Sequence, residues 1–214
     1  MSYVRFCAFP PPASKWKDKP KGETLKYRNF FELKKRNIEN VDYAIIRRCL
    51  IAKNIPVIIS IHGGKTEPYT EIIANGIAGD KFNYYAFLAI KKGLRIPSPN
   101  FDEPKCEEIC KKSKFVVAIH GEKKKKEKYV YIGGRNNDLK DKIYKKLHDN
   151  EIKVKILESG HLAGLCEQNI CNRYSDGIQL EITNGLRKDT YLREKLIESV
   201  KKVLIDALNT EFKK

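Results

Sequence analysis

Two short apolar runs constrain the fold of this 214-residue chain most strongly, because each ends directly in a histidine followed by glycine. Residues 56–61 lead into His62-Gly63-Gly64, and residues 115–119 lead into His120-Gly121. Short runs rich in valine and isoleucine are typical of buried strands. In an open α/β sheet, ligands bind beyond the carboxyl ends of the strands. We therefore expect both histidines at that edge of a sheet.

Predicted strands and helices alternate along the rest of the chain. Hydrophobic periodicity predicts helices over residues 31–35, 70–78, 104–112, 138–149 and 192–212. Apolar or alternating stretches predict strands over residues 43–46, 57–61, 84–88, 115–119, 128–134, 153–157 and 177–182, with a helical alternative open for 43–46 and 84–88. This order predicts one α/β domain over residues 1–214, an open mixed or parallel sheet flanked by helices, with an irregular lead-in over residues 1–40.

The charge balance is strongly basic. The chain has 43 lysines and arginines against 27 acidic residues, a formal charge of +16. This excess favours polyanionic partners such as acidic polymers, nucleic acid or anionic surfaces, and its sign alone does not choose among them. The run Lys123-Lys124-Lys125-Lys126 indicates a solvated loop tip rather than an arginine-based surface that reads bases.

The amino terminus lacks the charged-then-apolar pattern of a signal peptide, and no apolar run reaches the length of a membrane span. We therefore expect a soluble monomer made in the cytoplasm, with release by cell lysis left open. The six cysteines lack the dense spacing of a small secreted scaffold, so reduced thiols are expected. Cys106 and Cys110 are four apart and Cys166 and Cys171 five apart, so neither pair has the spacing of a zinc knuckle.

Three residues near the two predicted strand ends have the side chains of a catalytic zinc site. Imidazole and carboxylate groups are zinc ligands, and catalytic sites use three protein ligands with one position left for water. His62, Glu67 and His120 supply that set. Gly63 and Gly64 remove side chains where the chain must turn to bring Glu67 back beside His62.

A hydrolytic site also needs a group that takes a proton from water and passes it to the leaving amine. Glu181 is the best candidate, because it lies in the apolar segment 178–182, where a buried carboxylate must be paired or used. Strand alternation puts Gln179 on the same face as Glu181. The pattern alone therefore leaves a polar outer face of a half-buried strand as an alternative.

Six segments carry a resemblance to a known family. They are His62-Gly63-Gly64-Lys65-Thr66-Glu67-Pro68, Asn100-Phe101-Asp102-Glu103-Pro104, Ala118-Ile119-His120-Gly121, Tyr131-Ile132-Gly133-Gly134, Asn169-Ile170-Cys171-Asn172-Arg173 and Gly177-Ile178-Gln179-Leu180-Glu181. In this order, they resemble the phage-type poly-γ-glutamate hydrolase family, zinc peptidases with a carboxypeptidase-like α/β fold. The resemblance extends from about residue 42 to residue 187. It implies that His62, Glu67 and His120 hold zinc and that Glu181 is the general base.

The resemblance also implies residues for substrate binding. Asn172 and Arg173 match the family's Asn-Arg pair, and a guanidinium suits bidentate capture of a carboxylate. Arg187 matches the family as well and is a second candidate. A structural pair between Arg173 and Asp176 is the alternative. Lys65 stands where the family more often has a third glycine, which makes the ligand loop bulkier and more basic.

The predicted function is zinc-dependent hydrolysis of the γ-glutamyl amide bonds of poly-γ-glutamate. This polymer has a free carboxylate on every unit, so a basic protein attracts it in a salt-dependent way. Two alternatives stay open. One is a zinc peptidase acting on another γ-glutamyl or cell-wall peptide. The other is a basic, phage- or replication-linked protein that binds nucleic acid, although the chain has no recognisable nucleic-acid-binding module.

Overall fold

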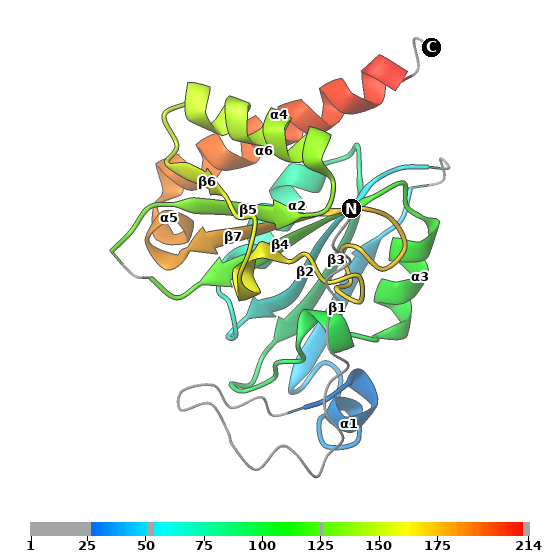
Figure 1. Cartoon of the computed structure of the whole chain (residues 1–214). Helices are drawn as coiled ribbons and strands as arrows, with labels where there is room; N and C mark the ends of the chain where they lie inside the picture. Colours follow the sequence, from blue (N-terminus) through cyan, green and yellow to red (C-terminus); the bar gives the residue numbers. More distant parts are fainter. Residues whose placement is uncertain (1–26, 51–53, 125, 212–214) are drawn as a thin grey trace.

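The computed structural model describes residues 27–50, 54–124 and 126–211, and its main feature is a seven-stranded sheet (Figure 1). The strands are β1 (Tyr43–Arg48), β2 (Val57–Gly64), β3 (Asn83–Ala89), β4 (Val116–Glu122), β5 (Val130–Gly134), β6 (Val154–Ile156) and β7 (Ile178–Thr183). The α-helices are α1 (Phe30–Lys34), α2 (Thr70–Ala78), α3 (Pro104–Lys112), α4 (Asn137–Asp149), α5 (Asn184–Lys188) and α6 (Thr190–Glu211). Two 3₁₀ turns are η2 (Ser98–Asn100) and η3 (His161–Ala163).

The sheet is mixed, as predicted. Its strand order is β1-β3-β2-β4-β7-β5-β6. The central strands β3, β2, β4 and β7 are parallel to one another, whereas β1 pairs antiparallel with β3 and β5 pairs antiparallel with β7. The carboxyl ends of β2, β4 and β7 therefore meet at one edge of the sheet.

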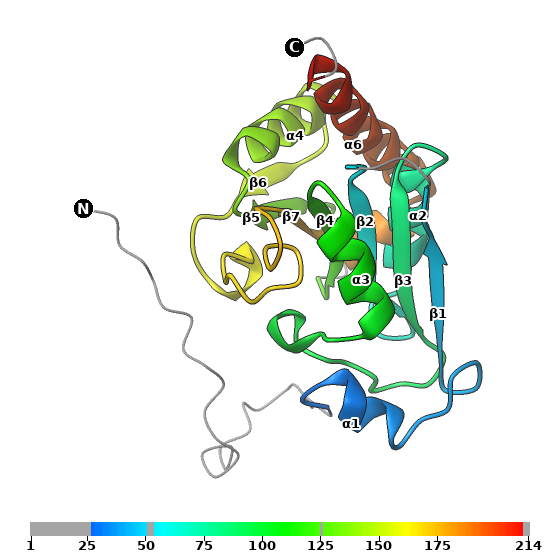
Figure 2. The ribbon, with the colours of Figure 1, turned by 90° about the vertical axis from the view of Figure 1, so that its right-hand side faces the viewer.

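Helices cover both faces of the sheet. On one face, alternate strand residues such as Ile58, Val117 and Leu180 pack beneath α2, α4 and α6 in one hydrophobic cluster. On the other face, residues such as Ile59 and Ala118 belong to a second cluster with side chains from α1 and α3. Figure 2 shows α3 in front of the sheet, and α4 and α6 above it. The strict two-residue alternation of the strands produces this division.

Local capping explains where several helices begin. The Glu103 side chain accepts a hydrogen bond from the Cys106 N–H at the start of α3, and Pro104 occupies the first turn. The Asn136 side chain accepts from the Leu139 N–H at the start of α4. At α2 the preceding residue, Tyr69, has φ 74°, and the Thr70 hydroxyl donates to the Glu67 carbonyl (2.8 Å).

The predicted elements occur close to their expected positions, with three differences. β2 and β4 each continue for two residues beyond the histidine, so His62 and His120 lie just inside the strand ends. Helix α5 was not predicted. Residues 27–40 are not irregular throughout, because they contain α1 near the helix predicted for 31–35, while residues 1–26 of the predicted lead-in lie outside the described residues. Segments 43–46 and 84–88 are strands, which excludes the helical alternative. In the described part of the chain, no helix has the length and apolarity that a membrane crossing requires.

Candidate metal centre

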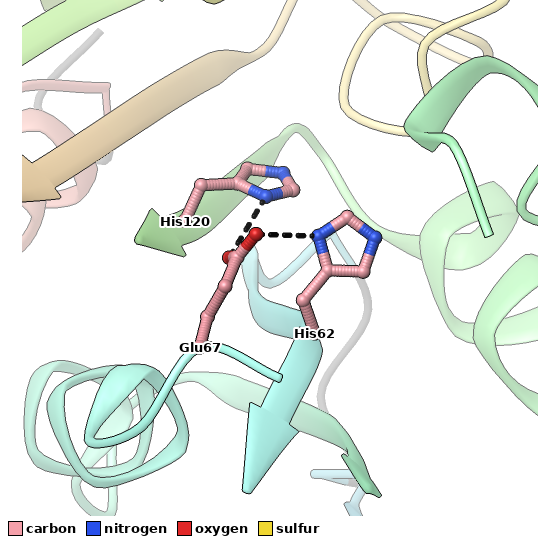
Figure 3. Close-up of side chains that lie close together, drawn as sticks. All are labelled: His62, Glu67 and His120. Carbon is pink, nitrogen blue, oxygen red and sulfur yellow. Dashed lines mark hydrogen bonds and ion pairs between the residues drawn. The ribbon is translucent and has the colours of Figure 1, made fainter. Parts of the chain in front are cut away.

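His62, Glu67 and His120 lie together at the carboxyl edge of the parallel strands (Figure 3). His62 comes from β2 and His120 from its neighbour β4, and Glu67 lies in the turn between β2 and α2. The Glu67 N–H donates to the His62 carbonyl (2.8 Å), which folds this turn back onto the strand end. Gly64 has φ +67°, and a Cβ there would meet the Ala89 carbonyl oxygen at 2.6 Å. The second glycine of the motif is therefore required by the backbone.

The ligand atoms of the three side chains converge on one point. The Nδ1 atom of His62 lies 3.1 Å from Glu67 Oε1, and the Nδ1 atom of His120 lies 3.5 Å from Glu67 Oε2. One potential ligand atom from each residue lies within 4.8 Å of the others. All three residues are at most 3% exposed. Two imidazoles and a carboxylate in this arrangement suit a divalent transition metal.

The outer atoms of the two imidazole rings have partners that fix the ring orientation. His62 Nε2 donates to the Ile96 carbonyl (2.7 Å), and His120 Nε2 lies 3.5 Å from the Ser98 hydroxyl oxygen. In known metal sites, ligating histidines use the other ring nitrogen in this way. Both Nδ1 atoms are therefore directed at Glu67, and the donor set fits a metal ion.

Opposite electrostatic effects act on Glu67. Burial by itself raises the pKa of this carboxyl group, but the charges and hydrogen bonds of His62 and His120 outweigh burial and hold the pKa well below its usual range. Oε2 also accepts a hydrogen bond from the Gly121 N–H (2.7 Å). Glu67 is therefore kept as a carboxylate, the form that binds a cation.

Glu181 lies on the next strand of the sheet, directly beside His120. The register of β4 and β7 pairs these two residues, so their side chains lie on the same face. Burial raises the pKa of Glu181 to about 7, with Glu67 adding to the rise and His120 and Arg95 opposing it. Glu181 is 7% exposed and Gln179 is 3% exposed, so the alternative of a polar outer face is wrong.

Two side-chain amides, hydrogen-bonded in series, hold the Glu181 carboxylate in position. Gln179 Nε2 donates to Glu181 Oε1 (3.0 Å), and Asn169 Nδ2 donates to Gln179 Oε1 (2.8 Å). Gly164 leaves room for this arrangement, since a Cβ there would lie 2.8 Å from Gln179 Cδ. The loop before β7 therefore orients the acid that the sequence predicted as general base.

Arg95 is a residue of the site that the sequence did not reveal. Its Nη1 atom lies 3.1 Å from Glu67 Oε1, and its side chain is 32% exposed. It lies in the connection between β3 and η2, the same connection that supplies the Ile96 carbonyl and the Ser98 hydroxyl. Arginine in a loop has no sequence signal of its own, and only the fold of this connection brings it to the site.

Arg173 and Asn172 have internal partners in the structure. The Arg173 guanidinium forms an ion pair with Glu107 and donates to the carbonyls of Phe101, Pro99 and Gln168. The Asn172 amide donates to the carbonyls of Gly164 (2.7 Å) and Cys166 (2.9 Å). Both residues thus tie loops together, and their role in substrate binding stays a prediction.

The alternative pair between Arg173 and Asp176 does not form in the structure. Asp176 Oδ1 lies 3.0 Å from Nε of Arg135, and Arg173 pairs with Glu107 instead.

Arg187 lies beneath Gly121 and joins three segments that meet at the site. Its guanidinium donates to the carbonyls of Pro68 (2.6 Å), Glu122 (3.1 Å) and Ile182 (3.0 Å). A Cβ at Gly121 would lie 2.6 Å from the guanidinium carbon, so glycine is required there. Arg187 is 2% exposed. Its contacts are those of an internal clamp, and binding of substrate by Arg187 also stays a prediction.

Comparisons with known proteins agree with this geometry. Residues 27–213 match the family described as poly-gamma-glutamate hydrolase. The SPbeta prophage-derived UPF0714 protein YoqZ of Bacillus subtilis (strain 168) is 35% identical over 182 residues, which are 78% of this chain and 61% of that protein. The chain thus spans less than two thirds of this relative's length.

Two solved structures share the fold. Bacteriophage poly-gamma-glutamate hydrolase superposes with a TM-score of 0.79 at 22% identity, over 86% of this chain and 98% of that one. A metallo-carboxypeptidase from Burkholderia cenocepacia superposes with a TM-score of 0.50 at 8% identity, over 78% of this chain and 61% of that one. The predicted carboxypeptidase-like α/β fold is therefore confirmed. Because the family match extends over residues 27–213, the chain belongs to the poly-gamma-glutamate hydrolase family.

Proposed function

We propose that this protein is a zinc-dependent hydrolase that cleaves the γ-glutamyl amide bonds of poly-γ-glutamate. The observation that carries the proposal is the convergence of His62, Glu67 and His120 beside the buried acid Glu181. The family match supports the substrate, and the name of the bacteriophage relative agrees with it.

Zinc is the proposed ion because of the ligand set. Two histidines and one glutamate form a recurrent catalytic zinc site. An ion bound there supplies a Lewis acid, which polarises the scissile carbonyl and makes water more acidic. His62, Glu67 and His120 would hold the ion, and the partners at Ile96 and Ser98 would keep both rings in the ligating orientation.

Glu181 is the proposed general base and acid. Its carboxylate accepts a proton from the attacking water and then donates that proton to the leaving amine nitrogen. A pKa of about 7 allows both steps near neutral pH. Gln179 keeps the carboxylate in place through its hydrogen bond to Oε1.

Arg95 is the proposed group that binds substrate at the centre. Its guanidinium is the partly exposed cation beside Glu67, and its geometry suits a carbonyl oxygen or a carboxylate. The amide oxygen of the substrate gains negative charge during attack, so a fixed cation there stabilises the transition state.

Metal content and hydrolysis, measured on the same preparations, test the proposal. We expect about one zinc per chain in the parent protein and in Glu181→Gln, and little in His120→Ala. Cleavage of poly-γ-glutamate should fall by about 10²- to 10⁴-fold in Glu181→Gln. Glu198→Gln, which changes an exposed acid on α6, is the matched control and should retain full activity.

Two results would contradict the proposal. One is a parent protein that takes up no metal even after incubation with zinc. The other is a zinc-loaded parent that leaves poly-γ-glutamate intact while cleaving a cell-wall peptide.

A further inference from the structure

A row of side chains leads from the candidate metal centre across the sheet to its edge. The strand register aligns His120 on β4 with Glu181 on β7, Glu181 with Tyr131 on β5, and Tyr131 with Lys155 on β6. Residues directly opposite in neighbouring strands present their side chains on the same face. The row therefore continues beyond Glu181 for two strands.

The opposite face of these two strands is the one that packs against helices. Val130, Ile132 and Val154 belong to the hydrophobic cluster beneath α4 and α6. Alternation therefore directs Tyr131 and Lys155 away from those helices, toward the face that bears Glu181. Lys155 and Lys153 are exposed and Tyr131 is half-buried. In Figure 1, β5 and β6 lie at the side of the sheet away from α3.

Part of the loop before β7, the turn η3, packs on the Gly133 end of β5. A Cβ at Gly133 would meet the Ala163 carbonyl oxygen at 2.2 Å, so η3 packs tightly on the sheet at that position. Tyr131 lies two residues earlier on the same strand face. Because Tyr131 is half-buried and Lys155 is exposed, the surface beside η3 is accessible to solvent at these two residues.

This surface has an excess of positive charge. The Nζ atom of Lys124 lies 3.2 Å from Glu127 Oε2 and 3.2 Å from the Tyr131 hydroxyl oxygen. The charge of Glu127 is therefore balanced by that of Lys124. Within residues 27–50, 54–124 and 126–211, neither Lys153 nor Lys155 has an ion-pair partner. Two exposed ammonium groups thus remain for an anion.

We infer that Lys153 and Lys155, beside Tyr131, form a binding site for the side-chain carboxylates of the polymer, here called the β5–β6 subsite. The inference rests on the proposed function. β6, which bears Lys155, lies two strand spacings, about 10 Å, from β7, which bears Glu181. A polymer chain held at the candidate centre reaches that distance with units on one side of the scissile bond, each of which has a carboxylate.

The stacking of the tyrosines favours an acidic polymer over nucleic acid at this subsite. The rings of Tyr129 and Tyr131 stack on each other with centroids 5.1 Å apart, and Lys124 lies over the Tyr131 ring at 5.5 Å. The ring faces that would stack on bases in a single-strand binding site are therefore already engaged. The Tyr131 hydroxyl is also engaged, since it accepts from Lys124 (3.2 Å) and donates to Glu127 (3.4 Å). The groups left for a ligand are the two ammonium ions, which suit carboxylates.

The test compares two double variants that remove the same charge. Lys153→Gln with Lys155→Gln removes both ammonium groups of the β5–β6 subsite. Lys111→Gln with Lys146→Gln is the control, because these lysines lie on α3 and α4 and have no ion-pair partner among the described residues. The zinc-loaded proteins are assayed on long poly-γ-glutamate, at low and at physiological salt, and with single-stranded DNA as a competitor.

We expect the subsite variant to raise KM for the long polymer about three- to tenfold at low salt, with kcat within about twofold of the parent. The difference should shrink at physiological salt, because exposed charges are screened. The control variant should show the parent KM.

Three outcomes would overturn the inference, and they can be told apart. A parent that cleaves the polymer and a subsite variant with unchanged KM would reject the subsite alone. A parent that cleaves no γ-glutamyl bond would reject the proposed function. Inhibition by DNA that is weakened in the subsite variant, with KM for the polymer unchanged, would assign the surface to nucleic acid.

Discussion

The two acids of the candidate centre have opposite electrostatic environments. Burial by itself raises the pKa of Glu67, but the charges and hydrogen bonds of two imidazoles hold it well below the usual range. Glu181 is buried with an amide as its hydrogen-bond partner, and burial raises its pKa to about 7. The two neighbouring carboxyl groups thus ionise over different pH ranges, which suits Glu67 to holding a cation and Glu181 to its proposed role in proton transfer.

The raised pKa of Glu181 predicts a pH-dependent cost in stability. In the unfolded chain this carboxyl group ionises near pH 4.5, whereas the folded protein keeps its proton up to about pH 7. The unfolded state therefore binds fewer protons in this interval, and the free energy of unfolding falls as pH rises. We therefore compare the free energies of unfolding of Glu181→Gln and the parent, measured by urea unfolding in the presence of chelator. The difference in favour of the variant should grow by about 2–3 kcal/mol from pH 5 to pH 8.

Glu198→Gln is the control for this experiment, since its side chain is exposed on α6. The difference in free energy of unfolding between this control and the parent should be the same at pH 5 and pH 8. A Glu181→Gln difference that is the same at pH 5 and pH 8 would contradict the raised pKa.

Among the elements, the strands of the centre were more predictable than the loops around it. The runs before His62 and His120 are continuous and rich in β-branched residues, a pattern typical of strands that are buried on both faces. The histidines were therefore expected at the correct edge, and the register explains why they meet. β4 lies beside β2 and β7 lies beside β4, an order that no local pattern encodes.

The loop residues were harder to predict because their partners are distant in the chain. Arg173 was expected to bind substrate or Asp176, yet it pairs with Glu107 and with carbonyls of the segment before α3. Arg95 reaches Glu67 only because the connection after β3 returns across the strand ends. Contacts of this kind depend on loop conformation, for which residue type gives little information.

Arg187 provides a prediction about how these elements are joined. Its buried guanidinium links the turn after β2, the end of β4 and the end of β7, each through a backbone carbonyl. Arg187→Gln leaves part of this set without a donor and should lower the free energy of unfolding by about 2–4 kcal/mol. Denaturant titration measures the loss. Arg36→Gln, at an exposed position after α1, should stay within about 0.5 kcal/mol of the parent, and a similar loss there would remove the case for a clamp.

For the molecule as a whole, a metal ion would act as a link between distant parts of the chain. It would connect the end of β2 with the end of β4, and it binds only when the sheet is folded. Ligands that bind only the native state stabilise it by mass action, about 2.7 kcal/mol at one hundred times Kd.

Zinc removal should therefore lower the melting temperature. For a protein of this size we expect a decrease of about 5–10 °C on chelation, read by calorimetry or circular dichroism. His120→Ala should show almost no response to chelator or to added zinc. An equal response in that variant would mean that zinc binds elsewhere.

The position of β7 links the closure of the sheet to the synthesis of residues 178–183. Among the described strands, β7 is the last in sequence, yet it lies inside the sheet between β4 and β5. Until residues 178–183 emerge from the ribosome, β1-β3-β2-β4 and β5-β6 are two groups of strands that no shared hydrogen-bond ladder joins. Glu181 arrives on the strand that joins them. A nascent copy that ends before residue 178 therefore has the three candidate ligands and an unjoined sheet but lacks Glu181, the proposed proton acceptor.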